Sequence, residues 1–458
     1  MTRNPVRSGV VPLHTRPEDA IPCALRFAAC ALQTGRAITL LACALLCLSS
    51  GLARAANRFP KPEFESGYQL PSPAYPQPAL VNQYLDVAVL CVALGLAAYL
   101  ALQRRSRAGI FALMCASLLY FGFWRKGCVC PIGSIQNMAY ALGEPAYRVP
   151  LVVAAFFILP LAMALVCGRV FCAAVCPLGA VQDALVLRPV RVPTWLAQTL
   201  SMGPYLYLGC AVLFAATGAG FLICRLDPFV PLFRLSGSAT MLGLAACFLL
   251  LGMFVARPYC RFVCPYGVLL NWLARISKWH VRITPDECVQ CRLCEDACPF
   301  GAILPPTPAQ LPEERATGVR RLIVLLLLLP VLAAAGGWAG RQLCGPLAQA
   351  HPAVRLAEQV WREETGLALK MTTESEAFRG TGTPLAALYA QAAAVQRQFA
   401  LGGWILGGFL GVIFCGKMIA LSLQRKRVDY EPDRGACVSC GRCFEYCPKE
   451  QVRRNARS

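Results

Sequence analysis

Residues 322–340 read LIVLLLLLPVLAAAGGWAG, a run of 19 residues without a charged side chain. A helix needs about 20 apolar residues to cross the roughly 30 Å hydrocarbon layer of a bilayer. This run therefore predicts a transmembrane helix. Two cysteine-rich stretches, at 288–298 and 437–447, flank it along the chain.

Composition extends this prediction to most of the chain. The 458 residues are 57% hydrophobic and 15% charged, and the mean hydropathy is +0.52. A soluble fold of this composition would expose more apolar surface than its charges can offset. We therefore predict an all-α polytopic membrane protein with about seven transmembrane helices. The other predicted spans are 84–102, 108–124, 149–167, 197–222, 236–256 and 399–422.

The N-terminal region has the features of a targeting segment. An apolar stretch at about 37–52 follows Arg26 and Arg36 and ends in the small residues around Ala55. This pattern predicts a signal peptide or N-terminal anchor over residues 1–56. The proline-rich residues 57–83 then predict an extended, exported linker.

Lysine and arginine counts indicate which loops face inward. With residue 57 outside, the inside segments hold 24 Lys and Arg and the outside segments hold 14. This bias predicts a bacterial inner-membrane protein with a cytoplasmic C-terminus. Basic inner loops also explain the net charge of +20, so we expect no nucleic-acid partner. The inside segments are 103–107, 168–196, 257–321 and 423–458, and the outside ones are 54–83, 125–148, 223–235 and 341–398.

Two runs of cysteines carry the most specific signal. Each run has the spacing C-x2-C-x2-C-x3-C-P, which is typical of bacterial ferredoxins that hold [4Fe–4S] clusters. Structural zinc usually uses paired C-x2-C knuckles, and disulfides are disfavoured on a reducing inner face. We therefore predict two [4Fe–4S] clusters. The runs consist of Cys288, Cys291, Cys294 and Cys298, followed by Pro299, and of Cys437, Cys440, Cys443 and Cys447, followed by Pro448.

The two runs are expected to work as one split ferredoxin. In two-cluster ferredoxins the fourth cysteine of each run binds the cluster of the other run. Here 278–310 forms the first half and 423–458 the second, separated by span 322–340, outside loop 341–398 and span 399–422. Two crossings return both halves to the same inner face. Cluster one would then use Cys447 with the first three cysteines of run one, and cluster two would use Cys298 with the first three of run two.

A second repeat is built on Cys-Pro within residues 84–277. Three copies read Cys128-x-Cys130-Pro131, Cys172-x3-Cys176-Pro177 and Cys260-x3-Cys264-Pro265, and each continues with x-Gly. Proline fits the first turn of a helix, and the positive helix end favours a thiolate beside it. The inward-facing Cys172, Cys176, Cys260 and Cys264 could hold a further iron–sulfur cluster, act as redox dithiols, or bind copper or zinc. They could also simply pack at helix starts.

Four cysteines are predicted on the outer face. They are Cys128, Cys130, Cys224 and Cys344, and their spacing does not decide between a disulfide pair and a metal site, including another cluster. Cysteines within the predicted spans behave as small apolar residues and receive no role. No histidine lies within a predicted span, so haem stacks held by two histidines are excluded.

Over residues 84–458 these motifs resemble the NosR/NapH membrane ferredoxin family. The likeness rests on the C-x3-C-P-x-G pair, on Arg282–Pro299 and on Cys437–Pro448. It implies an accessory of exported reductases that moves electrons between the inner side or the quinol pool and an exported acceptor. NosR-type proteins carry a large exported flavin domain before their spans, whereas residues 57–83 read as a linker. The resemblance therefore favours a NapH-like relative.

Two functional hypotheses follow. The first is an electron-transfer component, not a stand-alone enzyme, that lies in membrane lipid, accepts electrons from quinol or a cytoplasmic donor and serves a periplasmic redox partner. The roughly 30 Å between the faces would then need a quinol or a partner subunit as a bridge. The second hypothesis is a maturation factor whose C-x3-C-P thiols reduce or bind copper for an exported metalloenzyme.

Overall fold

The computed structural model describes residues 80–127, 130–187, 189–283, 288–307, 315–367, 371–422 and 427–456. The predicted signal peptide and almost all of the linker therefore lie outside the described residues, as does Cys128. The described part is mostly helical, and its one sheet has two strands. This agrees with the predicted all-α class.

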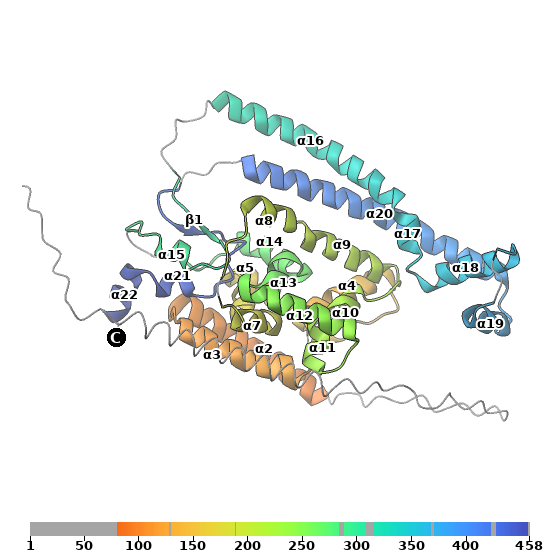
Figure 1. The fold of residues 1–458 in the computed structure, drawn as a ribbon, viewed down its shortest axis with the longest axis horizontal. Helices are drawn as coiled ribbons and strands as arrows, with labels where there is room; N and C mark the ends of the chain where they lie inside the picture. The colour runs from red at the N-terminus through yellow and green to blue at the C-terminus, as the bar shows by residue number, and fades with distance from the viewer. Residues whose placement is uncertain are drawn as a thin grey trace, which may run out of the picture. The chain divides into compact units, whose positions relative to one another are not determined.

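In the described residues, apolar helices lie at the positions of all seven predicted spans. Five of them are long and apolar enough to cross a membrane: Asn82–Gln103, Arg107–Trp124, Thr194–Ala216, Ala316–Gln342 and Leu385–Ser422. The other two, Leu151–Cys167 and Ala239–Phe254, are shorter. In Figure 1 the seven helices are α2 (Leu80–Ala98) with η1 (Tyr99–Gln103), α3 (Arg107–Ser117) with η2 (Leu118–Trp124), α5 (Leu151–Cys167), α8 (Thr194–Leu200) with α9 (Gly203–Ala216), α12 (Ala239–Phe254), α16 (Arg315–Gln342) and α20 (Leu385–Ser422).

Two predicted boundaries are wrong. The helix expected to reach residue 222 ends at Ala216, because Gly218 and Gly220 adopt positive φ angles of 71° and 141°. The helix expected from residue 399 already begins at Leu385, so its first four turns belong to the predicted outside loop. Hydropathy missed this extension because these turns carry Gln391, Gln396 and Arg397 among their alanines.

Short helices fill the segments between the long ones. All three Cys-Pro prolines stand at the first position of a helix, as predicted: Pro131 opens α4, Pro177 opens α7 and Pro265 opens α14. The short helices are α4 (Pro131–Gly143), α6 (Val170–Ala174), α7 (Pro177–Ala184), α10 (Leu222–Leu226), α11 (Phe229–Arg234), α13 (Pro258–Phe262), α14 (Pro265–Arg275), α17 (Cys344–Ala348), α18 (Pro352–Glu364) and α19 (Thr373–Gly380).

The two ferredoxin halves meet in the folded chain. Strand β1 (Ile303–Leu304) of the first half pairs antiparallel with β2 (Glu431–Pro432) of the second, with Ile303 opposite Pro432. The Asp433 N–H also donates to the Ala302 carbonyl at 2.8 Å. Helices α15 (Leu293–Asp296) and α21 (Arg442–Glu445) contact each other, and α22 (Pro448–Asn455) follows. The long hairpin between the halves thus brings its ends together.

Two of the predicted inside segments, 103–107 and 168–196, contact these halves. Arg105 pairs with Glu450 at 2.6 Å, and Arg169 donates to the Gly435 carbonyl at 3.0 Å. Arg191, in the same segment as Arg169, pairs with Asp296. The other two inside segments, 257–321 and 423–458, carry the halves themselves. The segments grouped by charge bias therefore share one end of the helices.

Helices α16 and α20 pack backbone to backbone along small residues (Figure 1). A Cβ atom added at Gly407 would lie 2.0 Å from the Gly336 carbonyl oxygen, and one at Gly340 would lie 2.0 Å from the Gly403 oxygen. Such glycines let transmembrane helices approach closely enough for van der Waals packing. The hairpin that joins the ferredoxin halves depends on this contact.

We expect Gly407→Ala to destabilise this hairpin by about 1–3 kcal/mol, because the new methyl group must push the backbones apart. Thermal unfolding in detergent would measure the loss. Gly416→Ala is the matched control, since no atom lies within 4 Å of a Cβ at that position of the same helix. Equal melting temperatures for both variants would contradict this account.

Candidate metal centres

The first ferredoxin cavity combines cysteines from both runs. Run one supplies three of its cysteines, and run two supplies one. This is the crossed set expected for cluster one. The remaining lining is mostly apolar, with two cationic side chains. The lining residues are Cys288, Cys291, Cys294, Cys447, Ile283, Val289, Tyr430, Arg292 and Lys449.

The second cavity is the counterpart of the first. Run two supplies three cysteines, and Cys298 of run one supplies the fourth. Four convergent thiols within a mostly apolar lining are the donor set of a [4Fe–4S] cluster, so the residues fit the group that the motifs imply. The cysteines of this cavity are Cys298, Cys437, Cys440 and Cys443.

The loop around the second cysteine has the same backbone conformation in both runs. The residues just before and just after the second cysteine have positive φ: Gln290 and Arg292 in run one, Ser439 and Gly441 in run two. Non-glycine residues adopt this conformation at a cost of order 1–3 kcal/mol. Such turns direct backbone N–H groups inward and create a concavity for anions. The Ser439 N–H points at the Cys437 sulfur at 3.4 Å.

Burial makes free thiols at these positions poor acids. It raises the pKa of Cys294 to about 11 and that of Cys437 to about 12. Each thiol would therefore carry its proton at neutral pH. A bound metal reverses this preference because its own charge stabilises the thiolate, so cluster binding releases protons.

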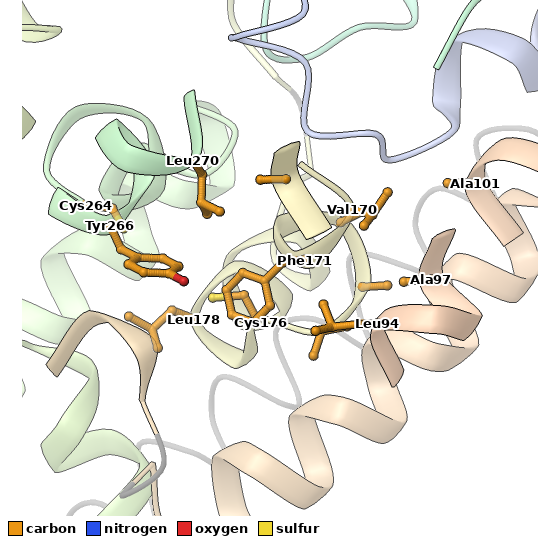
Figure 2. Close-up of a cluster of buried hydrophobic side chains, with 14 of the residues drawn as sticks. Leu94, Ala97, Ala101, Val170, Phe171, Cys176, Leu178, Cys264, Tyr266 and Leu270 are labelled. Carbon is orange, nitrogen blue, oxygen red and sulfur yellow. The ribbon is translucent and has the colours of Figure 1, made fainter. Parts of the chain in front are cut away.

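The Cys-Pro thiols Cys172, Cys176, Cys260 and Cys264 interact electrostatically with one another, so the structure brings this predicted quartet together. Cys176 and Cys264 lie directly before their helices, among Phe171, Leu178 and Tyr266 (Figure 2). The helix ends act on these thiols as predicted, but burial has the larger effect. Burial raises the pKa of both thiols well above the usual value, and the opposing first-turn amides of Gly179 and Gly267 do not offset it.

An arginine precedes each pair by three residues and reaches across to the other pair. Arg257, before Cys260, donates to the Cys172 carbonyl, and Arg169, before Cys172, interacts with Cys260. A Cβ at Gly179 would lie 3.1 Å from the Arg257 guanidinium. The glycine of the C-P-x-G motif thus leaves room for the opposite arginine.

Asp183 on α7 links the Cys-Pro site to cavity two. Its carboxylate is buried and pairs with Arg107 at 2.9 Å, Arg442 at 3.2 Å and Arg257 at 3.5 Å. Burial alone would raise the pKa of Asp183, but the three guanidiniums lower it to about 2. Arg107 also donates to the Cys440 carbonyl at 2.9 Å. The Arg-x2-Cys spacing was visible in the sequence, whereas nothing there singled out Asp183.

The predicted outer quartet is only partly assembled. Cys130, directly before α4, interacts with Cys224, and both interact with Asp227. Cys344 packs in a separate hydrophobic cluster with Leu347 and Ala348, so the structure does not support its grouping with the others. Burial raises the pKa of Cys130 to about 12 and that of Asp227 to about 6. Sequence reasoning missed Asp227.

The outer and inner thiols are closer than expected. Cys130 interacts electrostatically with Cys176 of the Cys-Pro site. These two thiols therefore lie nearer to each other than the roughly 30 Å expected between the two faces. Across the described ranges, no three His, Cys, Asp or Glu side chains gather closely enough for a single metal ion.

Comparison with known proteins agrees with these sites. The 4Fe-4S binding domain profile matches residues 107–150, 149–193 and 238–284, one match for each Cys-Pro copy. A second 4Fe-4S binding domain profile matches residues 281–304, which include the first ferredoxin run. The protein therefore carries 4Fe–4S binding domains, with cysteines for more than two clusters.

Curated relatives extend the likeness. NirI of Paracoccus denitrificans is 29% identical over 44% of this chain, and the regulatory protein NosR of Pseudomonas aeruginosa is 30% identical over 48%. The chain is related to the NosR/NapH-type proteins. YccM of Escherichia coli (strain K12), an electron transport protein by name, is 27% identical over 37% of the chain. The matched region spans 52% of YccM, 32% of NirI and 34% of NosR. No solved structure matches. These relatives and domains support a membrane-associated 4Fe–4S electron-transfer role.

The charge network at Asp183 gives a stability prediction. Asp183→Asn leaves the buried Arg257 guanidinium and two partly buried ones without their carboxylate. Breaking a buried ion pair costs about 3–5 kcal/mol. We expect a lower melting temperature and faster proteolysis within residues 427–456. Asp296→Asn is the control, because its pair with Arg191 is exposed and worth about 0–1 kcal/mol. Similar losses in both variants would contradict the assigned role.

Proposed function

We propose that this protein carries electrons across the bacterial inner membrane, between the cytoplasmic side or the quinol pool and a periplasmic acceptor. The observation that carries the proposal is the succession of sulfur sites from the two crossed cavities to the Cys-Pro thiols. Clusters held there supply one-electron chemistry. The excess of Lys and Arg in the segments that meet the ferredoxin halves supports a cytoplasmic ferredoxin unit and C-terminus.

The ligands are assigned by site. Cluster one is held by Cys288, Cys291, Cys294 and Cys447, and cluster two by Cys437, Cys440, Cys443 and Cys298. A third cluster is held by Cys172, Cys176, Cys260 and Cys264. The assignment is supported by the cysteine linings of the two cavities and by the mutual interactions of the Cys-Pro thiols.

Charged side chains connect the Cys-Pro site with cavity two. Arg257 is fully buried, contacts the Cys172 carbonyl and interacts electrostatically with both Cys260 and Cys440. Asp183 fixes this guanidinium and also holds Arg107, which donates to the Cys440 carbonyl. A fixed positive charge between two sites stabilises the added electron on either one, because reduction makes a cluster more negative.

The crossed ligand sets make a sharp prediction. Cys447→Ser should remove about four irons per chain and the electron paramagnetic resonance (EPR) signal of cluster one, although Cys447 lies in run two. Cys298→Ser should remove the signal of cluster two. Iron and acid-labile sulfide, measured on anaerobically purified protein, give the count, with about 12–16 irons expected in the unaltered protein.

Cys247→Ser is the control, because this cysteine is exposed on α12 away from the sulfur sites. Loss of the cluster two signal from Cys447→Ser would show uncrossed sets. Near-zero iron in well-folded unaltered protein would refute the electron-transfer proposal itself.

The Cys172→Ser variant distinguishes the copper maturation hypothesis from the electron-transfer proposal. Electron transfer predicts a periplasmic partner that keeps its metal but is no longer reduced. Copper handling predicts a partner that lacks metal and is rescued by added copper. Metal analysis of the partner from both strains distinguishes these results.

A further inference from the structure

The segment from Ile223 to Phe229 repeats the geometry of a Cys-Pro copy. It reads Cys224-x2-Asp227-Pro228, against Cys260-x3-Cys264-Pro265 in the third copy. In both segments the first cysteine lies in a five-residue helix, which is α10 for Cys224 and α13 for Cys260. The second ligand position, Asp227 or Cys264, then comes directly before a proline and the next helix. Asp227 stands where the third copy has Cys264.

The backbone follows the same path in these segments. The N–H of Asp227 donates to the carbonyl of Ile223, the residue directly before Cys224, at 2.8 Å. The N–H of Cys264 donates to the carbonyl of Tyr259, directly before Cys260, at 2.9 Å. The N–H of Cys176 likewise donates to the carbonyl directly before Cys172, at 3.0 Å. A side chain at the second position is thus presented in the same way each time.

The facing copies hold these segments through an equivalent glutamine. The Gln182 Oε1 atom, five residues after Pro177, accepts a hydrogen bond from the N–H of Tyr259, the residue directly before Cys260, at 3.0 Å. The Gln136 Oε1 atom, five residues after Pro131, likewise accepts a hydrogen bond from the N–H of Ile223, directly before Cys224, at 3.0 Å. The α4–α10 contact therefore has the arrangement of the α7–α13 contact. A Cβ at Gly133 would lie 3.7 Å from the Cys224 sulfur, which puts that thiol over the first turn of α4.

We propose that Cys130, Cys224 and Asp227 hold an iron–sulfur cluster on the outer side of the Cys-Pro site, with the Asp227 carboxylate in the position of a cysteine. This site rests on the proposed electron-transfer function and deepens it. Cys344, which the sequence grouped with the outer cysteines, has no part in it.

Burial and charge agree with a cation-rich occupant. Asp227 is 3% exposed, and its Oδ1 atom accepts the Phe229 N–H at 2.9 Å. Cys130 and Cys224 both interact electrostatically with this carboxylate, so two sulfurs and one carboxylate share the site. Sulfur and carboxylate oxygen are both donor types that bind iron.

Two substitutions at Asp227 test the site in the full-length protein. Asp227→Asn keeps the hydrogen bond to Phe229 but weakens metal binding, so we expect the iron content to fall by up to about four per chain. Asp227→Cys recreates the C-P dipeptide and should retain the iron, with a changed EPR signal and a lower midpoint potential for one cluster. Cys344→Ser is the control and should leave both iron and spectrum unchanged.

The ferredoxin signals serve as an internal reference. If they persist while Asp227→Asn keeps the full iron content and an unaltered spectrum, the outer site is wrong and the electron-transfer proposal stands. If the unaltered protein lacks all cluster signals, the proposed function fails instead. Equal iron losses in the Asn and Cys variants would assign Asp227 a structural role and overturn its role as a ligand.

Discussion

The buried carboxylate of Asp183 is the contact on which the arrangement of the sulfur sites depends. Its three arginine partners come from the start of α3, the segment before α13, and α21 of the second ferredoxin half. One side chain thus joins the membrane helices, the Cys-Pro repeat and the ferredoxin. Three guanidiniums around one carboxylate leave two positive charges in excess, which is costly in a buried site. Anionic clusters held in cavity two and at the Cys-Pro site, as proposed, would offset that excess.

The Cys-Pro repeat explains how so many thiols fit into one helical bundle. Each copy starts a helix at its proline, and in the second and third copies the arginine before the first cysteine crosses to the other copy. The x-Gly position must stay small, because at Gly179 a Cβ would press on Arg257 and the Cys172 carbonyl. The motif is therefore a packing solution as well as a ligand set: cysteine, proline and glycine each occupy a position that the neighbouring copy determines.

Sequence reasoning reached the parts of the site that depend on local spacing. The crossed cysteine sets followed from the motif, and the proline positions fixed the helix starts. Features that depend on tertiary contact were missed. Asp183 is one acid on a short amphipathic helix, and the grouping of Cys344 with Cys130 assumed that residues on one face are neighbours. The helix dipole was expected to favour thiolates at Cys176 and Cys264, but desolvation inside the bundle is the larger effect.

A carboxylate at the outermost site also gives the route a direction. Thiolates donate more electron density to iron than oxygen or nitrogen ligands do, and replacing them raises the reduction potential of a cluster. With Asp227 as a ligand, the outer site therefore has a higher potential than an all-thiolate site in similar surroundings. Arginine contacts would raise the potential of a cluster at the Cys-Pro site for a different reason, through charge. Under the proposed assignment, electrons that enter at the ferredoxin would move outward to sites that hold them more strongly, which suits the proposed reduction of an exported acceptor.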